Sequence, residues 1–180
     1  MLKTAKFLLA LLVALVLMLC FRALAFTICT VEGEGLSPVF HRGDRVLVNR
    51  WSYGLRVGGG EGLFSYGRIG RRPICRGDLV AFENPKDASQ VLICRCKALP
   101  GDTIHQPDGN ITIVPGLVNC ANADHYWMEA LSTENPTDSR ILGPIPEQFI
   151  IGRATAIVFS HDTTEPLWRG WDGARFLLAL

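Results

Sequence analysis

The sequence predicts a mainly β domain behind one N-terminal transmembrane helix. Its 180 residues suit one domain of ordinary size plus a membrane anchor. The 18 glycines and 10 prolines are scattered along the chain, as frequent turns between short strands require. Hydrophobic residues make up 48% of the chain, and the first thirty residues contribute heavily to that share. We therefore expect residues 1–29 to form a cytoplasmic N-terminus and anchor, and residues 30–180 to form a β domain outside the cytoplasm.

The N-terminal segment has the pattern of a helix that inserts with its N-terminus in the cytoplasm. Lys3 and Lys6 precede an apolar run, Phe7–Phe21, which Arg22 interrupts. That run is shorter than the roughly 20 residues that a spanning helix needs. If the guanidinium of Arg22 reaches the interface, the apolar segment continues to Cys29 and can span the bilayer. The two lysines then hold the N-terminus on the cytoplasmic side.

A cleavable secretory signal is the competing interpretation of the same residues. A basic start, an apolar middle and the small-x-small exit Ala23-Leu24-Ala25 are typical of such signals. Both interpretations place residues 30–180 outside the cytoplasm, and the local pattern does not separate them.

Short apolar runs bounded by turn residues predict the strands of the β domain. In order, they are Val46–Val48, Leu79–Phe82, Val91–Cys96, Ile111–Val114, Ile150–Ile151 and Ala154–Phe159. The glycine- and arginine-rich segment 54–72 is expected to be a mobile surface loop. Residues 168–180 mix tryptophan, arginine and leucine, which fits either the membrane interface or an element that closes the core.

Charge and cysteine usage narrow the functional classes. The 18 basic and 17 acidic residues nearly balance and form no basic stripe, which argues against a nucleic-acid partner.

Cys94 and Cys96 are two residues apart and would share one face of a strand. They could form a redox pair or half of a metal site, but the simpler interpretation is that they pack as two small apolar side chains. The chain holds no Cys-x-x-Cys pair and its four histidines are far apart in sequence, so we expect no metal site and no cofactor. The sequence does not decide whether Cys75 or Cys120 forms a disulfide.

Residues 35–48 carry the first motif of a known family. Gly35-Leu36-Ser37-Pro38 is followed by Gly43-Asp44 and a short apolar run. This layout resembles the nucleophile region of type I signal peptidases, in which Ser-Met-x-Pro precedes Gly-Asp-x-Val. Pro38 and the Gly-Asp pair keep the family's spacing, but Gly35 stands at the position of the nucleophilic serine.

Further segments resemble the family's other motifs in the same order. Arg76–Phe82 is similar to Gly-Asp-Ile-Val-x-Phe, and Cys94–Asp102 is similar to Lys-Arg-Val-x-Gly-x-Pro-Gly-Asp. Ala130–Arg140 falls on Gly-Asp-Asn-Arg-x-Asn-Ser-x-Asp-Ser-Arg and keeps Asn135 and the last three residues, Asp138-Ser139-Arg140. Two short motifs then follow, Gly143–Pro146 and Ile151–Ala154. On these motifs the chain is identified as a member of the signal peptidase I family between residues 31 and 160.

The resemblance implies an antiparallel β-sheet domain with an extended apolar surface set against the membrane, and it favours an uncleaved anchor. The family cleaves signal peptides after small residues with a Ser-Lys dyad. Its lysine must be neutral to accept the hydroxyl proton, which burial beside apolar groups achieves. A serine hydroxyl and a backbone N–H hold the oxyanion.

The family positions that break the bond are altered in this chain. The resemblance places the nucleophile at Gly35, the lysine at Cys94, the oxyanion hydroxyl at Gly33 and the hydroxyl that supports the lysine at Pro136. Positions expected to shape turns and strands are kept, namely Pro38, Gly43, Asp44, Gly77, Asp78, Pro100, Gly101, Asp102, Asp138 and Arg140. The resemblance also implies that the last two pair and hold their loop.

Substitute residues define an alternative. Ser37 lies two positions beyond the nucleophile position, about 6.5 Å along a strand. Lys97 lies three positions from Cys94, which turns it to the opposite face of a strand. A Ser37–Lys97 dyad would therefore need both segments to shift. A thiolate nucleophile at Cys94 would need a nearby base, for which His41 and His105 are the candidates.

The sequence thus predicts a membrane-anchored serine endopeptidase homologue that is itself a catalytically inactive pseudoenzyme. Its expected role in signal peptide processing and protein secretion is to bind the signal peptides of exported proteins, or an active signal peptidase paralogue, at the cytoplasmic membrane. The alternative is an active signal-peptide endopeptidase that uses Ser37 and Lys97. An unrelated structural or assembly role on the same scaffold is the third hypothesis.

Overall fold

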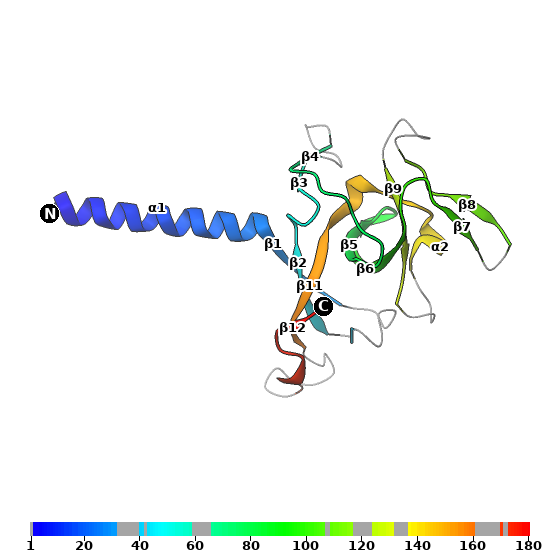
Figure 1. The fold of residues 1–180 in the computed structure, drawn as a ribbon. Coiled ribbons are helices and arrows are strands. Elements are labelled where there is room, and N and C mark those ends of the chain that lie inside the picture. The colour runs from blue at the N-terminus through cyan, green and yellow to red at the C-terminus, as the bar shows by residue number, and fades with distance from the viewer. Residues whose placement is uncertain are drawn as a thin grey trace.

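The structure is a long helix followed by a mainly β domain (Figure 1), which confirms the predicted class. The computed structural model describes residues 2–31, 40–41, 43–58, 66–106, 109–116, 124–131, 137–160, 170 and 173–180. Its elements are α1 (Leu2–Ala25), β1 (Phe26–Thr30), β2 (Asp44–Asn49), β3 (Leu55–Val57), β4 (Gly67–Ile69), β5 (Leu79–Asn84), β6 (Asp87–Ala98), β7 (Thr103–His105), β8 (Ile111–Ile113), β9 (His125–Glu129), α2 (Ser139–Leu142), β10 (Ile145–Pro146), η1 (Glu147–Phe149), β11 (Ile150–Ser160), η2 (Gly173–Arg175) and β12 (Leu178–Ala179).

Helix α1 projects away from the β domain (Figure 1). The side chains of residues 6–19 are all exposed, and all but Lys6 are apolar, whereas Ala25 at the end of the helix is buried. Within the described part of the chain, no helix combines the length and the apolar character needed to cross a membrane. The segment is helical as expected, but its prediction as a transmembrane helix is not supported.

One antiparallel sheet organises the domain. Its strand order is β1-β2-β11-β5-β6-β9-β10, and β12 pairs with β11. The two predicted strands near the C-terminus are one long strand, β11, which pairs with both β2 and β5. Gly152 lies where β11 passes the backbone of Asn49 so closely that a Cβ would collide with its carbonyl oxygen. Glycine at this position therefore permits the close approach of the two strands.

Alternating side chains give the sheet a core on each face. In β5 and β6, Val80 faces Cys94 on one side of the sheet, and Ala81 faces Ile93 on the other. The first core contains Tyr53, Ile74, Val80, Phe82, Cys94, Cys96, Tyr126, Met128, Ile145 and Ile150. The second core contains Val31, Phe40, Val46, Val48, Ala81, Ile93, Ala154 and Ile157. A smaller cluster of Ala98, Val114 and Trp127 supports the β7–β8 hairpin.

The segment expected as a mobile loop is structured in its described parts, 54–58 and 66–72, where β3 and β4 pair as a hairpin. The side chain of Arg68 is 1% exposed, and its guanidinium donates to the carbonyl oxygens of Gly54 and Glu147. Arg71 forms a 2.6 Å ion pair with the Glu147 carboxylate. The buried guanidinium of Arg68 requires such partners. Together with the half-exposed Arg71, it fixes the hairpin against η1. The glycine- and arginine-rich composition alone does not reveal that these arginines bind Glu147, which lies much later in the sequence.

The C-terminal residues described, 173–180, join the sheet as a short strand. Ala179 of β12 faces Ala156 of β11, and Leu178 faces Ile157. The N–H of Leu180 also donates to the carbonyl oxygen of Thr155. Residues 178–179 thus add a strand to the sheet, but the side chains of residues 176–180 are exposed and do not close the core.

Candidate functional site

The three Gly-Asp pairs of the sequence form three copies of one turn. Gly43, Gly77 and Gly101 have φ values of 91°, 91° and 88°, which favour glycine. In each copy the aspartate carboxylate accepts the backbone N–H three residues earlier. These bonds are His41 to Asp44 at 2.8 Å, Cys75 to Asp78 at 3.1 Å and Leu99 to Asp102 at 2.7 Å. Each turn leads directly into a strand, so these retained positions shape the backbone.

Each of the three turns also bonds to one residue of a separate segment. The glycine N–H donates to the carbonyl oxygen of that residue, and the aspartate carbonyl accepts its N–H. The three bonded residues are Val31, Cys96 and Val114. Each aspartate has an arginine partner as well, in the pairs Asp44–Arg175 at 2.6 Å, Asp78–Arg153 at 3.4 Å and Asp102–Arg76 at 2.6 Å. The turns therefore join segments that are distant in sequence.

Asp138 and Arg140 form an ion pair at the start of α2. The Arg140 guanidinium lies 2.6 Å from the Asp138 carboxylate, which is fully buried. That carboxylate also accepts the backbone N–H groups of Arg140 and Ala130, each at 2.9 Å. The hydroxyl of Ser139 accepts the N–H of Met128 at 2.9 Å. The Asp-Ser-Arg motif thus caps α2 and ties it to the end of β9.

Cys94, at the family's lysine position, points into the first core. The residue is 2% exposed and lies opposite Val80 in the sheet. Burial, followed by the charge of the nearby Asp138 carboxylate, raises the pKa of its thiol to about 12, while Arg140 opposes the shift. A pKa raised in this way favours the protonated thiol at neutral pH.

Cys96 lies on the same face of β6, as the spacing of two residues predicts. Burial is the main cause that raises the pKa of its thiol to about 12 as well. Its sulfur lies 3.7 Å from the carbonyl oxygen of Ala98, to which the thiol donates. The four cysteines described at 29, 75, 94 and 96 are free thiols. Cys94 and Cys96 pack as two small apolar side chains, and Cys120 lies outside the described residues.

Lys97, the proposed substitute base, points away from Cys94. Its side chain is 61% exposed, and its ammonium lies 3.4 Å from the carboxylate of Glu129. The β6–β9 register shifts between Cys96 and Ala98, so Lys97 occupies an irregular point of the ladder. The ammonium is thus engaged with Glu129 at the surface and not with the buried Cys94.

The nucleophile segment falls outside the described residues. Gly33, Gly35, Ser37 and Pro38 belong to residues 32–39, and Pro136 belongs to residues 132–136. The described neighbours of the first segment, Val31 and Phe40, are buried in the second core together with Ile93. Ile93 directly precedes Cys94 in β6 but faces the other side of the sheet, so Val31 and Phe40 pack on the face opposite to the Cys94 side chain.

Sequence reasoning identified the three aspartates of the turns but not their arginine partners. Arg175, Arg153 and Arg76 lie far from those aspartates along the chain, and no local pattern marks them. The repeated Gly-Asp pair was the available signal, because it appears three times before an apolar run or a short strand. It predicts equivalent turns but not which cation each carboxylate meets.

Comparisons with known proteins agree with the motifs. The family described as "Signal peptidase, peptidase S26" matches residues 4–119. The mitochondrial inner membrane protease subunit 2 of Saccharomyces cerevisiae is 27% identical over 132 residues, which cover 73% of this chain and 67% of that protein. Its counterpart in Mus musculus is 25% identical over 148 residues, which cover 78% and 71%. Subunit 1 of the mouse protease is 34% identical over 84 residues, 44% of this chain and 47% of that protein. The chain spans about half of that last relative, and it belongs to the signal peptidase family, peptidase S26.

Proposed function

We propose that this chain is a catalytically inactive member of its family that acts in signal peptide processing by binding. The observation that carries the proposal is the environment of Cys94. At the position of the family's general base, the chain has a buried thiol whose pKa is raised to about 12. A protonated thiol cannot accept a proton from a hydroxyl group at neutral pH.

The nucleophile position supports the same conclusion from sequence. Gly35 has no side chain that could attack a peptide carbonyl, and Gly33 offers no hydroxyl to the oxyanion. In serine proteases, loss of the nucleophile alone lowers turnover by on the order of a millionfold. The substitute pair is disfavoured because Lys97 is exposed and bound to Glu129. Binding of extended peptides, by contrast, requires only the sheet and its apolar surfaces.

The ligands we propose are the signal peptides of exported proteins or an active paralogue of the same family. Support for a paralogous partner comes from the relatives, which are named as subunits 1 and 2 of one protease. Two related chains in one protease would allow one of them to lose its catalytic groups.

We further propose that the chain is attached to a membrane through residues 1–29. The exposed apolar side chains along α1 support attachment, because a surface of this kind is unfavourable in water. The names of the relatives place those proteins at the mitochondrial inner membrane. The attachment is testable by alkaline extraction of membranes from cells that express the full chain, in which an attached protein stays with the membrane pellet.

The function is tested by incubating the purified full chain with a precursor whose signal peptide ends in an Ala-x-Ala site and carries a photo-crosslinker. The proposal predicts a crosslinked adduct without a cleaved product. A precursor whose Ala-x-Ala site is replaced by bulky residues controls for non-specific capture. If no adduct forms, signal-peptide binding is excluded and an active paralogue is the remaining proposed ligand. Crosslinking in cells would then have to recover that paralogue.

A further inference from the structure

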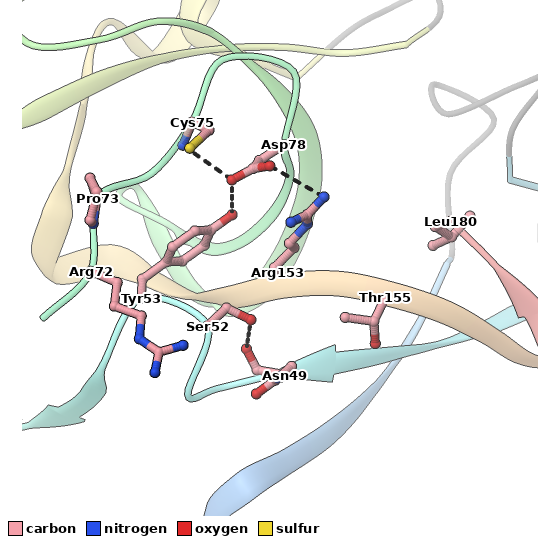
Figure 2. Close-up of a pocket in the computed structure, with 10 residues that line it drawn as sticks. All are labelled: Asn49, Ser52, Tyr53, Arg72, Pro73, Cys75, Asp78, Arg153, Thr155 and Leu180. Atoms are coloured by element: carbon pink, nitrogen blue, oxygen red, sulfur yellow. Dashed lines mark hydrogen bonds and ion pairs between the residues drawn. The ribbon is translucent and has the colours of Figure 1, made fainter. Parts of the chain in front are cut away.

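A pocket away from the family's catalytic positions lies where β2, β11 and the chain before β5 meet (Figure 2). Its volume is about 510 Å³, within the usual range of small-molecule sites. The lining consists of Asn49, Ser52, Tyr53, Arg72, Pro73, Cys75, Asp78, Arg153, Thr155 and Leu180. None of the family's catalytic positions is among them.

The register of the sheet places this pocket at the base of α1. Phe26 of β1 lies directly opposite Asn49 of β2, which lies directly opposite Arg153 of β11. Two strand spacings, about 10 Å, therefore separate the first residue after the helix from Arg153. The N–H of Arg50 donates to the carbonyl oxygen of Ala25, the last residue of α1. The loop that supplies the pocket wall is thus bonded to the end of the helix.

The acceptors of the pocket are already occupied. The Asp78 carboxylate accepts the Tyr53 hydroxyl at 3.0 Å and the Cys75 N–H at 3.1 Å, and it faces Arg153 at 3.4 Å (Figure 2). Burial, followed by the charge of Asp78, raises the pKa of Tyr53, so its hydroxyl stays a donor. The Ser52 hydroxyl donates to the backbone carbonyl of Asn49.

The donors of the pocket are in surplus. Among the described residues, no carboxylate lies within ion-pair distance of the Arg72 guanidinium. Arg153 is 51% exposed and has a single, long contact with Asp78, so most of its N–H groups remain available. Among the side chains that line the pocket, one carboxylate faces two guanidinium groups. A ligand that supplies oxygen acceptors and negative charge is the complement of this surface.

The surroundings of the pocket match a ligand held at a membrane surface. Trp51, beside the pocket wall, is 45% exposed, and Phe26 is 41% exposed. Aromatic side chains of this kind are enriched at the level of lipid headgroups. Helix α1 ends at Ala25, next to Phe26, which lies one strand away from Asn49 of the pocket. A headgroup phosphate entering at this point would have its acyl chains beside the helix.

We propose that this pocket binds the phosphate of an anionic lipid headgroup, with Arg72 and Arg153 as its ligands. The inference rests on the membrane attachment proposed above, and it adds a specific lipid contact to it. Arg72 is the better test residue, because its side chain supports no other described contact. Arg95 is the matched control, since its register opposite Leu79 places it on the other face of the sheet from Asp78 and Arg153.

The test is a titration of the full chain, in neutral detergent micelles, with short-chain phosphatidylglycerol, short-chain phosphatidylcholine and inorganic phosphate. Calorimetry should show saturable binding of phosphatidylglycerol and weaker binding of the other two. Arg72→Gln should weaken phosphatidylglycerol binding about tenfold, because one charge-assisted contact is lost. Arg72→Lys should lose less, and Arg95→Gln should bind as the wild type does.

Equal affinity of Arg72→Gln and Arg95→Gln for phosphatidylglycerol would overturn the proposal. So would equal binding of phosphatidylcholine, or inorganic phosphate bound as tightly as the lipid, which would indicate a soluble anion instead. Circular dichroism of each variant checks folding. If the chain remains in the membrane pellet but shows no headgroup preference, only the lipid site is refuted. If alkaline pH extracts the chain from the membrane, the proposed membrane attachment, on which the lipid site rests, is refuted as well. Signal-peptide crosslinking by Arg72→Gln, measured in parallel, reports on peptide binding separately.

Discussion

The guanidinium of Arg175 lies 2.6 Å from the carboxylate of Asp44, although 131 positions separate the two residues. Asp44 is fully buried and begins β2, while Arg175 ends η2 just before β12. Asp44 belongs to the first Gly-Asp turn, which bonds to Val31 at the edge of the nucleophile segment. The C-terminal end of the chain is thereby attached to the motif through which the family was recognised.

Removal of this arginine should destabilise the whole domain. Arg175→Met leaves a buried carboxylate without its cation, which typically costs about 3–5 kcal/mol. Urea unfolding of the full chain in detergent measures the loss. Arg95→Met removes an exposed arginine and should change the free energy of unfolding by no more than about 0.5 kcal/mol. Equal effects of the two substitutions would show that the Arg175–Asp44 pair contributes nothing specific.

The Asp138 carboxylate should matter more than its neighbour's hydroxyl. Asp138→Asn removes the partner of Arg140 and weakens two backbone hydrogen bonds, so we expect a loss of about 3 kcal/mol. Ser139→Ala removes one accepted bond from the N–H of Met128 and should cost about 1–2 kcal/mol. Thermal unfolding of both variants gives the order, and the reverse order would contradict the assigned network.

The turn glycines provide a test of backbone strain. Gly77 has a φ of 91° and open space where a Cβ would stand, so Gly77→Ala tests conformation without a clash. We expect a loss of about 1–2 kcal/mol in the free energy of unfolding. Gly67 also faces open space, but its φ lies outside the positive region. Gly67→Ala should therefore be tolerated, and a comparable loss there would indicate that strain is not the cause.

Stability should fall at alkaline pH because of the two buried thiols. Burial raises the pKa of Cys94 and of Cys96 from an ordinary value of 9.0 to about 12. In the unfolded chain these thiols ionise above pH 9, whereas the folded chain keeps them protonated. Their contribution is fully present below pH 9 and is lost as the pH rises towards 12. The shift bounds the loss at about 4 kcal/mol for each thiol.

A double variant isolates that effect from other alkaline titrations. Cys94→Ala with Cys96→Ala should flatten the decline in stability between pH 9 and pH 12, whatever its stability at pH 7. Folded wild-type protein should also react with a thiol reagent at exposed Cys75 before Cys94 or Cys96. Mass spectrometry locates the label, and early modification of Cys94 would show that this thiol is accessible.

The strands were predictable where the sequence is locally consistent. The runs at 46–48, 79–82 and 91–96 lie in β2, β5 and β6, because each combines apolar residues with a turn or a boundary beside it. The face shared by Cys94 and Cys96 followed from the two-residue period of a strand. That residues 150–151 and 154–159 form the single strand β11 was not predictable, because Gly152 and Arg153 interrupt the apolar run. The strand is continuous because it pairs with both β2 and β5.

Long-range contacts explain most of what the sequence did not reveal. The hairpin β3–β4 depends on the bonds from Arg68 to Gly54 and Glu147 and on the ion pair of Arg71 with Glu147, which no local window contains. For the candidate site, the motifs located Cys94 and the Asp138–Arg140 pair. The pocket at the base of α1 had no sequence signal, because its residues come from four separate stretches of chain.

The most direct test of the central claim is a cleavage assay on the purified full chain, with an Ala-x-Ala precursor as the substrate and its crosslinked adduct as a measure of binding. The account predicts that the precursor binds and remains uncleaved over hours, and that Ser37→Ala and Lys97→Ala change neither result. Cleavage at the Ala-x-Ala site that is lost in Ser37→Ala or Lys97→Ala would contradict it, because the chain would then be an active endopeptidase with a rearranged dyad.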